Sequence, residues 1–276
     1  MAGIVPNRAM GAKPLVRAGR GLGGFAARIA SIVLLLILWE ALVRSGAVTP
    51  FQLPSLVRVA DRLGTDAWSG ELFYNAWLTL YRALAGFAIA GIAGVALGML
   101  IFKSAFARWF FDPIISAGFP MPKVAFLPIV ILWFGVYDMP KITMIVIDAI
   151  FPVVTATILG FNGVDRQLIW SARNMGAREG ELLWQVMLPA ALPQIMTGLQ
   201  VALPVALIIA VATEMLMGGQ GLGGAMLEAS RMADSPGTFA GLVATTIMGY
   251  AAIKLMAFAR RRLLQWHAET QQSGGI

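Results

Sequence analysis

The sequence lacks the residue types from which many active sites are built. It has no cysteine, which excludes disulfides, thiolate metal sites and cysteine nucleophiles. Its only histidine, His267, lies in the polar stretch near the C-terminus, so the apolar part offers no histidine for catalysis or metal binding. It also has no G-x-S-x-G elbow for a serine nucleophile and no G-x-x-x-x-G-K-[ST] loop for ATP phosphates. We therefore predict that the chain is not an enzyme.

Charged residues are scarce as well, at 13% of the 276 residues. A typical soluble domain has about 25%. Hydrophobic residues make up 58% of the chain and gather in long runs, each sufficient to cross a hydrocarbon core of about 30 Å. The sequence therefore predicts an all-α integral membrane protein.

Six apolar runs predict six transmembrane helices. They lie at about 29–43, 77–102, 113–135, 142–160, 194–217 and 238–258. We expect residues 29–258 to form one transmembrane domain, with cytoplasmic tails at 1–28 and 259–276. The first run is short and follows a basic stretch, which also fits a signal peptide, although no clear small-x-small cleavage site follows it.

The net charge of +7 comes from basic residues at the ends of the apolar runs, which favours contacts with lipid headgroups over a nucleic-acid partner. One set of tails and loops carries thirteen Lys and Arg, and the other set carries five. The positive-inside rule then places both termini and the connection 161–193 in the cytoplasm. The outer loops are about 44–76, 136–141 and 218–237, and the glycine-rich stretch 218–224 is predicted to be a flexible outer turn.

Two runs indicate how they pack. The second run has small residues at every fourth position: Gly86, Ala90, Gly94 and Gly98. Such a ridge without bulky side chains lets another helix approach closely. The third run has four prolines: Pro113, Pro120, Pro122 and Pro128. Because proline removes backbone donors, this run is predicted to be either a broken helix of the kind that lines a transport pathway or a kinked packing helix.

The connection 161–193 is too polar to span a membrane and too regular for a slack loop. Two sets of apolar residues recur at helical spacing: Leu168, Ile169, Ala172 and Met175, then Leu182, Leu183, Val186 and Met187. Gly176 separates the sets, and Pro189 with Pro193 is expected to end the second helix before the fifth span. A helix–glycine–helix unit with an apolar side is suited either to docking on a partner or to lying among lipid headgroups.

This connection resembles the cytoplasmic signature of permease subunits of ATP-binding-cassette (ABC) importers. That signature reads Glu-Ala-Ala, three residues, Gly, nine residues, then Ile-x-Leu-Pro. The chain keeps the spacing with Trp170-Ser171-Ala172, Gly176 and Val186-Met187-Leu188-Pro189. Trp170 replaces the acid of the signature, so the contact made by that acid does not carry over.

Further motifs make the sequence similar to the nitrate/sulfonate/taurine branch of these permeases, over about residues 50–260. They are Leu53-Pro54-Ser55, Leu80-Tyr81-Arg82 with Gly86-Phe87, Ala125-Phe126-Leu127-Pro128, Ile131-Leu132-Trp133-Phe134-Gly135, Pro140-Lys141-Ile142, Gly198-Leu199-Gln200, Ala212-Thr213-Glu214-Met215 and Gly221-Leu222-Gly223. The resemblance implies the type I ABC importer permease fold, with six transmembrane helices and cytoplasmic coupling helices, in a bacterial inner membrane.

The resemblance also implies a division of labour among subunits. A second permease copy forms a homodimer with the first, two ABC ATPase subunits bind ATP and Mg²⁺, and a periplasmic binding protein delivers the solute. The permease itself binds no cofactor. The residues expected to couple it to the ATPase are Trp170, Ser171, Ala172, Gly176, Ala177, Leu182, Val186, Leu188 and Pro189.

Several residues inside the apolar runs are candidates for the translocation pathway or its gate. They are Lys123, Pro128, Asp148 and Glu214. Charges inside a membrane are costly and usually face a bundle interior or an aqueous cavity. Each charge also has a structural alternative. Glu214 can pair with Arg82, Lys123 can extend to the cytoplasmic surface, and Asp148 can bond the backbone near Pro152.

The sequence thus predicts the permease subunit of an importer for a small oxyanion. The alternative is a proton-coupled secondary transporter in which Glu214 and Asp148 carry protons, but that alternative leaves the docking-type connection unexplained. The solute stays open among sulfonates, taurine, nitrate, bicarbonate, aromatic carboxylates and pyrimidine precursors, with Lys123 and the basic balance favouring anions.

Overall fold

The structure is a computed structural model that describes residues 20–264. Most of the two predicted tails, together with His267, lies outside the described residues. Every regular element within 20–264 is a helix, as predicted. The chain divides into two compact units, one ending at Leu56 and the other beginning at Val57.

The first unit consists of α1 (Arg20–Arg44) and the segment that follows it. α1 covers the first predicted run. The Trp39 indole Nε1 donates a hydrogen bond to the Pro54 carbonyl at 2.9 Å, and the Leu56 amide donates to Glu40 Oε2 at 3.1 Å. These bonds fold the Leu-Pro-Ser segment back onto the end of α1.

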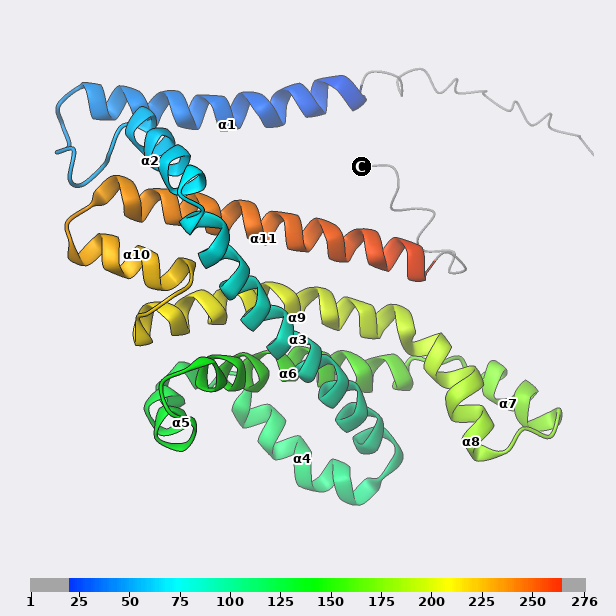
Figure 1. The fold of residues 1–276 in the computed structure, drawn as a ribbon. Coiled ribbons are helices and arrows are strands. Elements are labelled where there is room, and N and C mark those ends of the chain that lie inside the picture. Colours follow the sequence, from blue (N-terminus) through cyan, green and yellow to red (C-terminus); the bar gives the residue numbers. More distant parts are fainter. Residues whose placement is uncertain (1–19, 265–276) are drawn as a thin grey trace, which may run out of the picture. The chain divides into compact units, whose positions relative to one another are not determined.

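The second unit contains the other helices, shown in Figure 1. They are α2 (Leu56–Trp68), α3 (Glu71–Lys103), α4 (Ala105–Gly118), η1 (Lys123–Phe126), α5 (Leu127–Phe134), α6 (Asp138–Asn162), α7 (Arg166–Asn174), α8 (Glu179–Glu181), η2 (Leu182–Met187), α9 (Leu188–Met217), α10 (Leu222–Arg231) and α11 (Ser235–Leu263). Within the described residues, four helical segments are long and apolar enough to cross a membrane, and the bent pair α4 with η1–α5 makes a possible fifth.

The core of this unit is formed by α3, α6 and α9, with α3 crossing the other two obliquely (Figure 1). The predicted ridge on α3 is confirmed. A methyl group at Gly94 would lie 2.8 Å from Val153 Cβ on α6, and one at Gly98 would lie 2.6 Å from Thr157 Cβ. Both distances are below van der Waals contact. Because Gly94 and Gly98 have no side chains, α6 packs directly against the backbone of α3 at these positions.

The third predicted span is a broken helix rather than a kinked one. α4 and the η1–α5 segment meet at an angle of 99°. The third run is predicted to begin at about residue 113, but α4 already begins at Ala105 and carries Pro113 inside it. Ser104 caps this early start by accepting a hydrogen bond from the Ala107 amide at 3.2 Å.

The second helix of the connection 161–193 does not end at its prolines, which corrects the prediction. One continuous helix runs over Glu179–Met217, and it passes through a π-helical turn, η2, directly before Pro189. The ring of a helical proline clashes with the carbonyl four residues back and offers no N–H donor. The wider hydrogen-bonding pattern of the π turn accommodates both effects. The helix therefore bends and continues into α9 (Figure 1).

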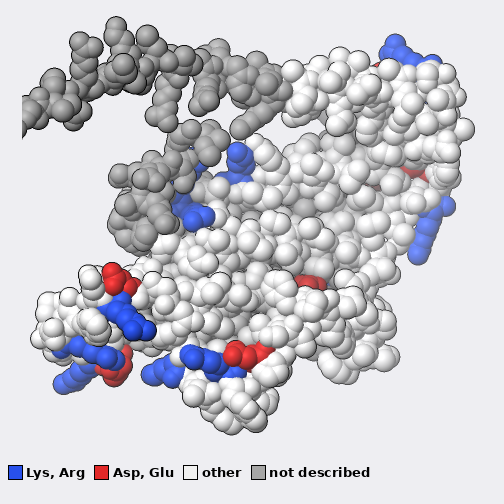
Figure 2. Space-filling model, turned by 180° about the vertical axis from the view of Figure 1, so that it is seen from behind, with Lys and Arg blue, Asp and Glu red and all other residues white. Residues whose placement is uncertain are grey.

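Two of the predicted outer loops also contain helices. The range 44–76 contains α2 and the start of α3, and the range 218–237 contains α10. Figure 2 shows that much of the surface is uncharged on the face it presents, and that Lys, Arg, Asp and Glu gather on the lobe formed by α7 and α8. That distribution fits a bundle embedded in lipid with a polar lobe at one end.

Candidate functional site

Glu214 on α9 is fully buried and lies at the centre of a hydrogen-bonded cluster. Arg82 Nη1 on α3 is 2.6 Å from Glu214 Oε1, and Arg82 is itself buried. The Thr79 hydroxyl donates to Glu214 Oε2 at 2.8 Å, and the Gly223 amide donates to the same oxygen at 3.1 Å. The carboxylate thus has one cation and two further donors. Such complete hydrogen bonding is what keeps a buried charge tolerable.

The glycine-rich stretch after α9 closes over this cluster. The Gly221 amide donates to Asn75 Oδ1 at 2.9 Å, and the Leu222 amide donates to the Thr79 hydroxyl at 2.9 Å. Arg82 Nη1 donates to the Gln220 carbonyl at 2.6 Å. Gly221 has a φ of 123°, and a side chain there would collide with the Glu214 carboxylate. The prediction of a flexible turn is therefore wrong. Residues 221–224 are buried and held by α3 and α9, and Leu222 already begins α10.

The cluster extends to the first turn of α6. Asp138 Oδ1 accepts a hydrogen bond from Arg82 Nε at 2.7 Å, so Arg82 joins acids from two helices. Lys141 is buried one turn further along α6, and within residues 20–264 no hydrogen bond or ion pair to its ammonium group is found. The structure thus brings Glu214 and Arg82 together, as the structural alternative predicted.

A second buried ion pair lies where the third span is broken. Lys123 in η1 is 3.0 Å from Asp148 Oδ1 on α6, and its ammonium group lies 4.7 Å from the centre of the Phe151 ring. The Lys123 side chain is buried, so the prediction that it extends to the cytoplasmic surface is wrong. Pro128 sits in the first turn of α5, beside this break. The structure thus joins two of the pathway candidates into one pair.

This pair lies deep in the bundle. Asp148 is ten residues from the start of α6 at Asp138, which is about 15 Å along a helix axis. A hydrocarbon core is about 30 Å thick, so the pair lies about half that thickness from the first residue of α6. An ion pair at that depth and at a helix break is a functional-site candidate by position alone.

The connection 161–193 forms the predicted helix–glycine–helix unit. α7 begins at an Asp165 cap, whose Oδ1 accepts from the Gln167 amide at 2.8 Å. It ends where Gly176 adopts a φ of 88°. The Gly176 amide donates to the Arg173 carbonyl at 2.9 Å, and the Ala177 amide donates to the Ala172 carbonyl at 3.1 Å. These two bonds form a Schellman motif, which ends α7. The motif explains why a glycine follows Ala172 after three residues in the signature.

The inner side of this unit is well packed. Ala172 and Ile169 of α7 contact the second helix, and both join a core with residues of α6 and α9. The second predicted apolar set belongs to the same core: Leu182, Leu183, Val186 and Met187. Among the other predicted coupling residues, Ala177 and Leu188 also pack against it, whereas Ser171, Gly176 and Pro189 are exposed.

The outer side of the unit leaves large apolar side chains exposed. Trp170 is 61% exposed, Met175 82% and Trp184 60%. Leu168 is exposed as well. By their spacing, the four residues of the predicted stripe share one side of α7. Ile169 and Ala172 pack in the core, whereas Leu168 and Met175, at the two ends of the stripe, stay exposed. We call Leu168, Trp170, Met175 and Trp184 the exposed aromatic surface.

Sequence reasoning missed part of the first cluster. Thr79 and Asn75 lie one turn apart on the same face of α3, before Arg82, and Asp138 opens α6. The signal was present, since polar residues spaced by three or four on an apolar helix point to a shared partner. Within the described residues, no group of three or more acidic or histidine side chains is placed to hold a metal ion.

Comparison with known proteins identifies the family. The model of the binding-protein-dependent transport system inner membrane component matches residues 86–266. The chain is 29% identical over 248 residues to the taurine transport system permease protein TauC of Escherichia coli K12, covering 88% of this chain and 90% of the relative. It is 29% identical to the putative aliphatic sulfonates transport permease protein SsuC of Bacillus subtilis 168, covering 90% of each.

The fold agrees with this result. A chain of the inward-facing MetNI methionine ABC transporter superposes with a TM-score of 0.63 at 17% identity, covering 72% of this chain and 98% of that one. The family model spans more than half of the sequence, including Glu214, the Lys123–Asp148 pair and the connection 161–193. The chain therefore belongs to the family of binding-protein-dependent transport system inner membrane components, the multi-pass permease subunits of ABC importers, in which ATP hydrolysis lies in a separate subunit.

Proposed function

We propose that this permease subunit carries a small oxyanion of the sulfonate or taurine kind, as part of a homodimer that works with two ATPase subunits and a binding protein. The observation that carries the proposal is the exposed aromatic surface on an otherwise well-packed lobe. A lobe whose inner side is buried and whose outer side exposes large apolar side chains among charged ones is suited to a protein partner. Because the chain belongs to the ABC permease family, the proton-coupled alternative has no support.

The proposed topology has six spans. α1 has 25 residues, about 38 Å at 1.5 Å per residue, which is sufficient to cross a membrane. Together with α3, the broken α4–α5 segment, α6, α9 and α11, it makes six. The excess of Lys and Arg on one side then places both termini and α7–α8 in the cytoplasm, as the sequence predicts.

The exposed aromatic surface is proposed to dock on the ATPase. The Schellman motif at Gly176 sets the angle between α7 and the helix Glu179–Met217. That helix continues without a stop into α9, which carries Glu214 at its far end. A displacement of the lobe is therefore transmitted to the buried cluster through one helix, which is the proposed coupling route. ATP and Mg²⁺ belong to the ATPase, and this chain binds no cofactor.

The Lys123–Asp148 pair is proposed to face the pathway. It lies near the membrane midplane, and the break in the third span brings both residues together there. A lysine at such a break offers a positive charge to a passing oxyanion, and Asp148 holds it when the site is empty. Glu214 and Arg82 are proposed to keep the glycine-rich stretch closed as an outer gate.

The homodimer is proposed from apolar surface that one chain leaves uncovered. α11 has 29 residues, and the buried ones among them are Gly237 and Ala240. α5 is apolar throughout and exposes Leu132 and Trp133. Lipid covers part of this surface, and a second copy is proposed to cover the rest.

The test is purification of the tagged chain in mild detergent, followed by reconstitution with its ATPase and binding protein in proteoliposomes. We expect the ATPase to co-purify in about equal amount and radiolabelled taurine or an alkanesulfonate to accumulate only with ATP inside. Glu214→Gln should lower uptake while the complex stays assembled. Uptake driven by a proton gradient without the ATPase would overturn the proposal, and loss of the complex in Glu214→Gln would make Glu214 structural.

A further inference from the structure

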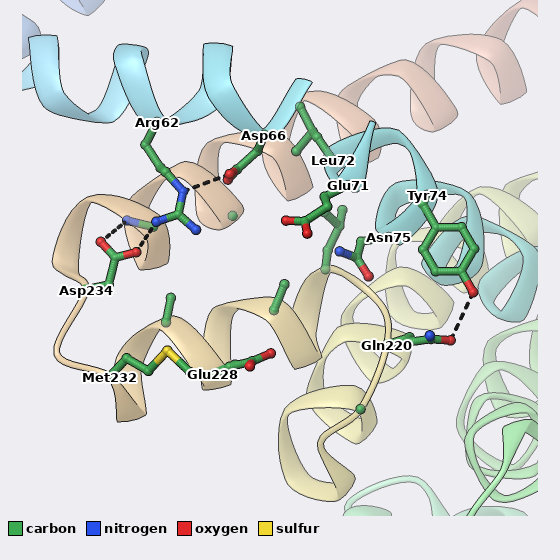
Figure 3. Close-up of a pocket in the computed structure, with 16 residues that line it drawn as sticks. Arg62, Asp66, Glu71, Leu72, Tyr74, Asn75, Gln220, Glu228, Met232 and Asp234 are labelled. Atoms are coloured by element: carbon green, nitrogen blue, oxygen red, sulfur yellow. Dashed lines mark hydrogen bonds and ion pairs between the residues drawn. The ribbon is translucent and has the colours of Figure 1, made fainter. Parts of the chain in front are cut away.

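A cavity of about 640 Å³ lies beside the glycine-rich stretch, at the end of the second unit opposite the α7–α8 lobe. The end of α2, the first turns of α3, and α10 with the start of α11 enclose it (Figure 3). None of the pathway or coupling candidates lines it. The cavity therefore lies apart from the α7–α8 lobe and from the Lys123–Asp148 pair, and in the proposed topology it belongs to the outer surface.

The cavity is acidic. Its lining includes Asp66, Glu71, Glu228 and Asp234, against Arg62 as its one cationic side chain. Arg62 Nε is 2.8 Å from Asp66 Oδ1, and Arg62 also pairs with Asp234. The hydrogen bond to Asp66 raises the pKa of Arg62, so its charge is permanent and already shared between two acids. The lining thus carries a net charge of −3.

Two carboxylates remain unpaired. Within residues 20–264, no ion pair or side-chain hydrogen bond is found for Glu71 or Glu228, which come from different helices. Figure 3 shows the Glu71 carboxylate directed toward the space between α2 and α10. The two acids therefore present negative charge from two sides of the cavity.

The rim of the cavity is aromatic and apolar. Met232 lines it and is 71% exposed, and Tyr74 lines it and is also exposed. Trp68, two residues after Asp66 on α2, is 95% exposed. Aromatic residues and methionine are enriched where proteins bind one another. An acidic hollow with such a rim has the composition of a protein interface.

We propose that this cavity is the docking site on the permease for the solute-binding protein, which inserts a Lys or Arg side chain between Glu71 and Glu228. The proposal rests on the proposed function, which supplies the partner and the side of the membrane. Charge selects this occupant. A net negative cavity repels an oxyanion solute and anionic lipid headgroups, and it attracts a basic protein segment.

The cavity is linked directly to the buried cluster. The Tyr74 hydroxyl at the rim donates to Gln220 Oε1 at 3.0 Å, and the Gln220 carbonyl accepts from Arg82 at 2.6 Å. A partner that displaces Tyr74 or α10 therefore acts on the residue that Arg82 holds. Docking of the loaded binding protein and opening of the outer gate therefore both involve Gln220.

The test uses the full importer in nanodiscs, with the binding protein that supports its uptake as the probe. Glu71→Gln/Glu228→Gln is compared with Asp61→Asn, an exposed acid on α2 outside the cavity. We expect the association rate constant of the double variant to fall by about tenfold at low salt, with the difference shrinking in high salt. Asp61→Asn should bind as the wild type does. Equal binding of the double variant and the wild type at both salt concentrations would overturn the proposal.

A second measurement protects the result against a folding defect. The chain has no cysteine, so Met232→Cys and Asp61→Cys each carry a single photo-crosslinker. We expect crosslinking to the binding protein from position 232 and not from position 61, and the reverse or an equal yield would overturn the proposal. If the wild-type importer binds no binding protein under any condition, the proposed function fails, whereas a failure confined to these variants concerns the docking site alone.

Discussion

The two ends of the second unit differ in how far one chain satisfies its own side chains. At the end with Glu214, α3 and the glycine-rich stretch supply every partner that the buried carboxylate needs. At the end with α7 and α8, the inner side is packed, but Trp170, Met175 and Trp184 remain exposed. The Glu214 carboxylate at the first end is satisfied within one chain, although the cavity beside it leaves Glu71 and Glu228 unpaired. The second is complete only when another protein covers it.

This difference separates the two kinds of variant that the structure allows. A substitution in the Glu214 cluster should act on the chain itself, because its partners are all internal. A substitution on the exposed aromatic surface should leave the chain unchanged and act on assembly. Each prediction below tests that separation.

The largest effect is expected from Arg82→Met. It leaves Glu214 buried without its cation, and breaking a buried pair from one side costs about 3–5 kcal/mol. The thermal unfolding temperature of the purified subunit in detergent should therefore drop. Arg82→Met/Glu214→Leu removes both charges and should recover most of the loss. A double variant no more stable than Arg82→Met would show that the pair is not an isolated unit.

The next effect is expected from Trp170→Ala/Trp184→Ala. If these side chains anchor the ATPase, the dissociation constant of the complex should rise by about thirtyfold for each tryptophan removed, since interface anchors contribute about 2 kcal/mol or more each. The unfolding temperature should not change, because both side chains are largely exposed. Trp109→Ala, at an exposed tryptophan on α4, is the matched control. An unchanged dissociation constant would contradict a docking role for this surface.

A smaller effect is expected from Gly176→Val. The φ of 88° at Gly176 suits glycine, and a β-branched residue there costs about 1–2 kcal/mol of strain. The Schellman turn should distort, and the ratio of transported solute to ATP hydrolysed should fall. Gly180 has equally open surroundings and no positive φ, so Gly180→Val should transport normally. Equal transport by both variants would separate the turn from coupling.

The smallest effect is expected from Glu179→Gln. It removes the exposed ion pair between Arg173 and Glu179, whose two charged atoms lie 2.9 Å apart. Exposed pairs contribute less than about 1 kcal/mol. The free energy of unfolding and the free energy of binding to the ATPase should each change by less than that amount. A large loss of affinity would mean that the charges of the lobe, and not its aromatic side chains, carry docking.

The sequence by itself determined the helical membrane class, the location of the apolar spans and the helix–glycine–helix unit. Hydrophobic runs and the residues that stop helices are local signals, and these local signals predicted the close approach at Gly94 and the turn at Gly176. Only the tertiary structure decided which charges meet. Thr79, Arg82, Asp138 and Glu214 come from three helices and are joined by packing, and the Lys123–Asp148 pair depends on how far the third span bends. The course of the helix past Pro189 was also a tertiary outcome, because packing of its two halves on one core outweighed the local preference of proline to end a helix.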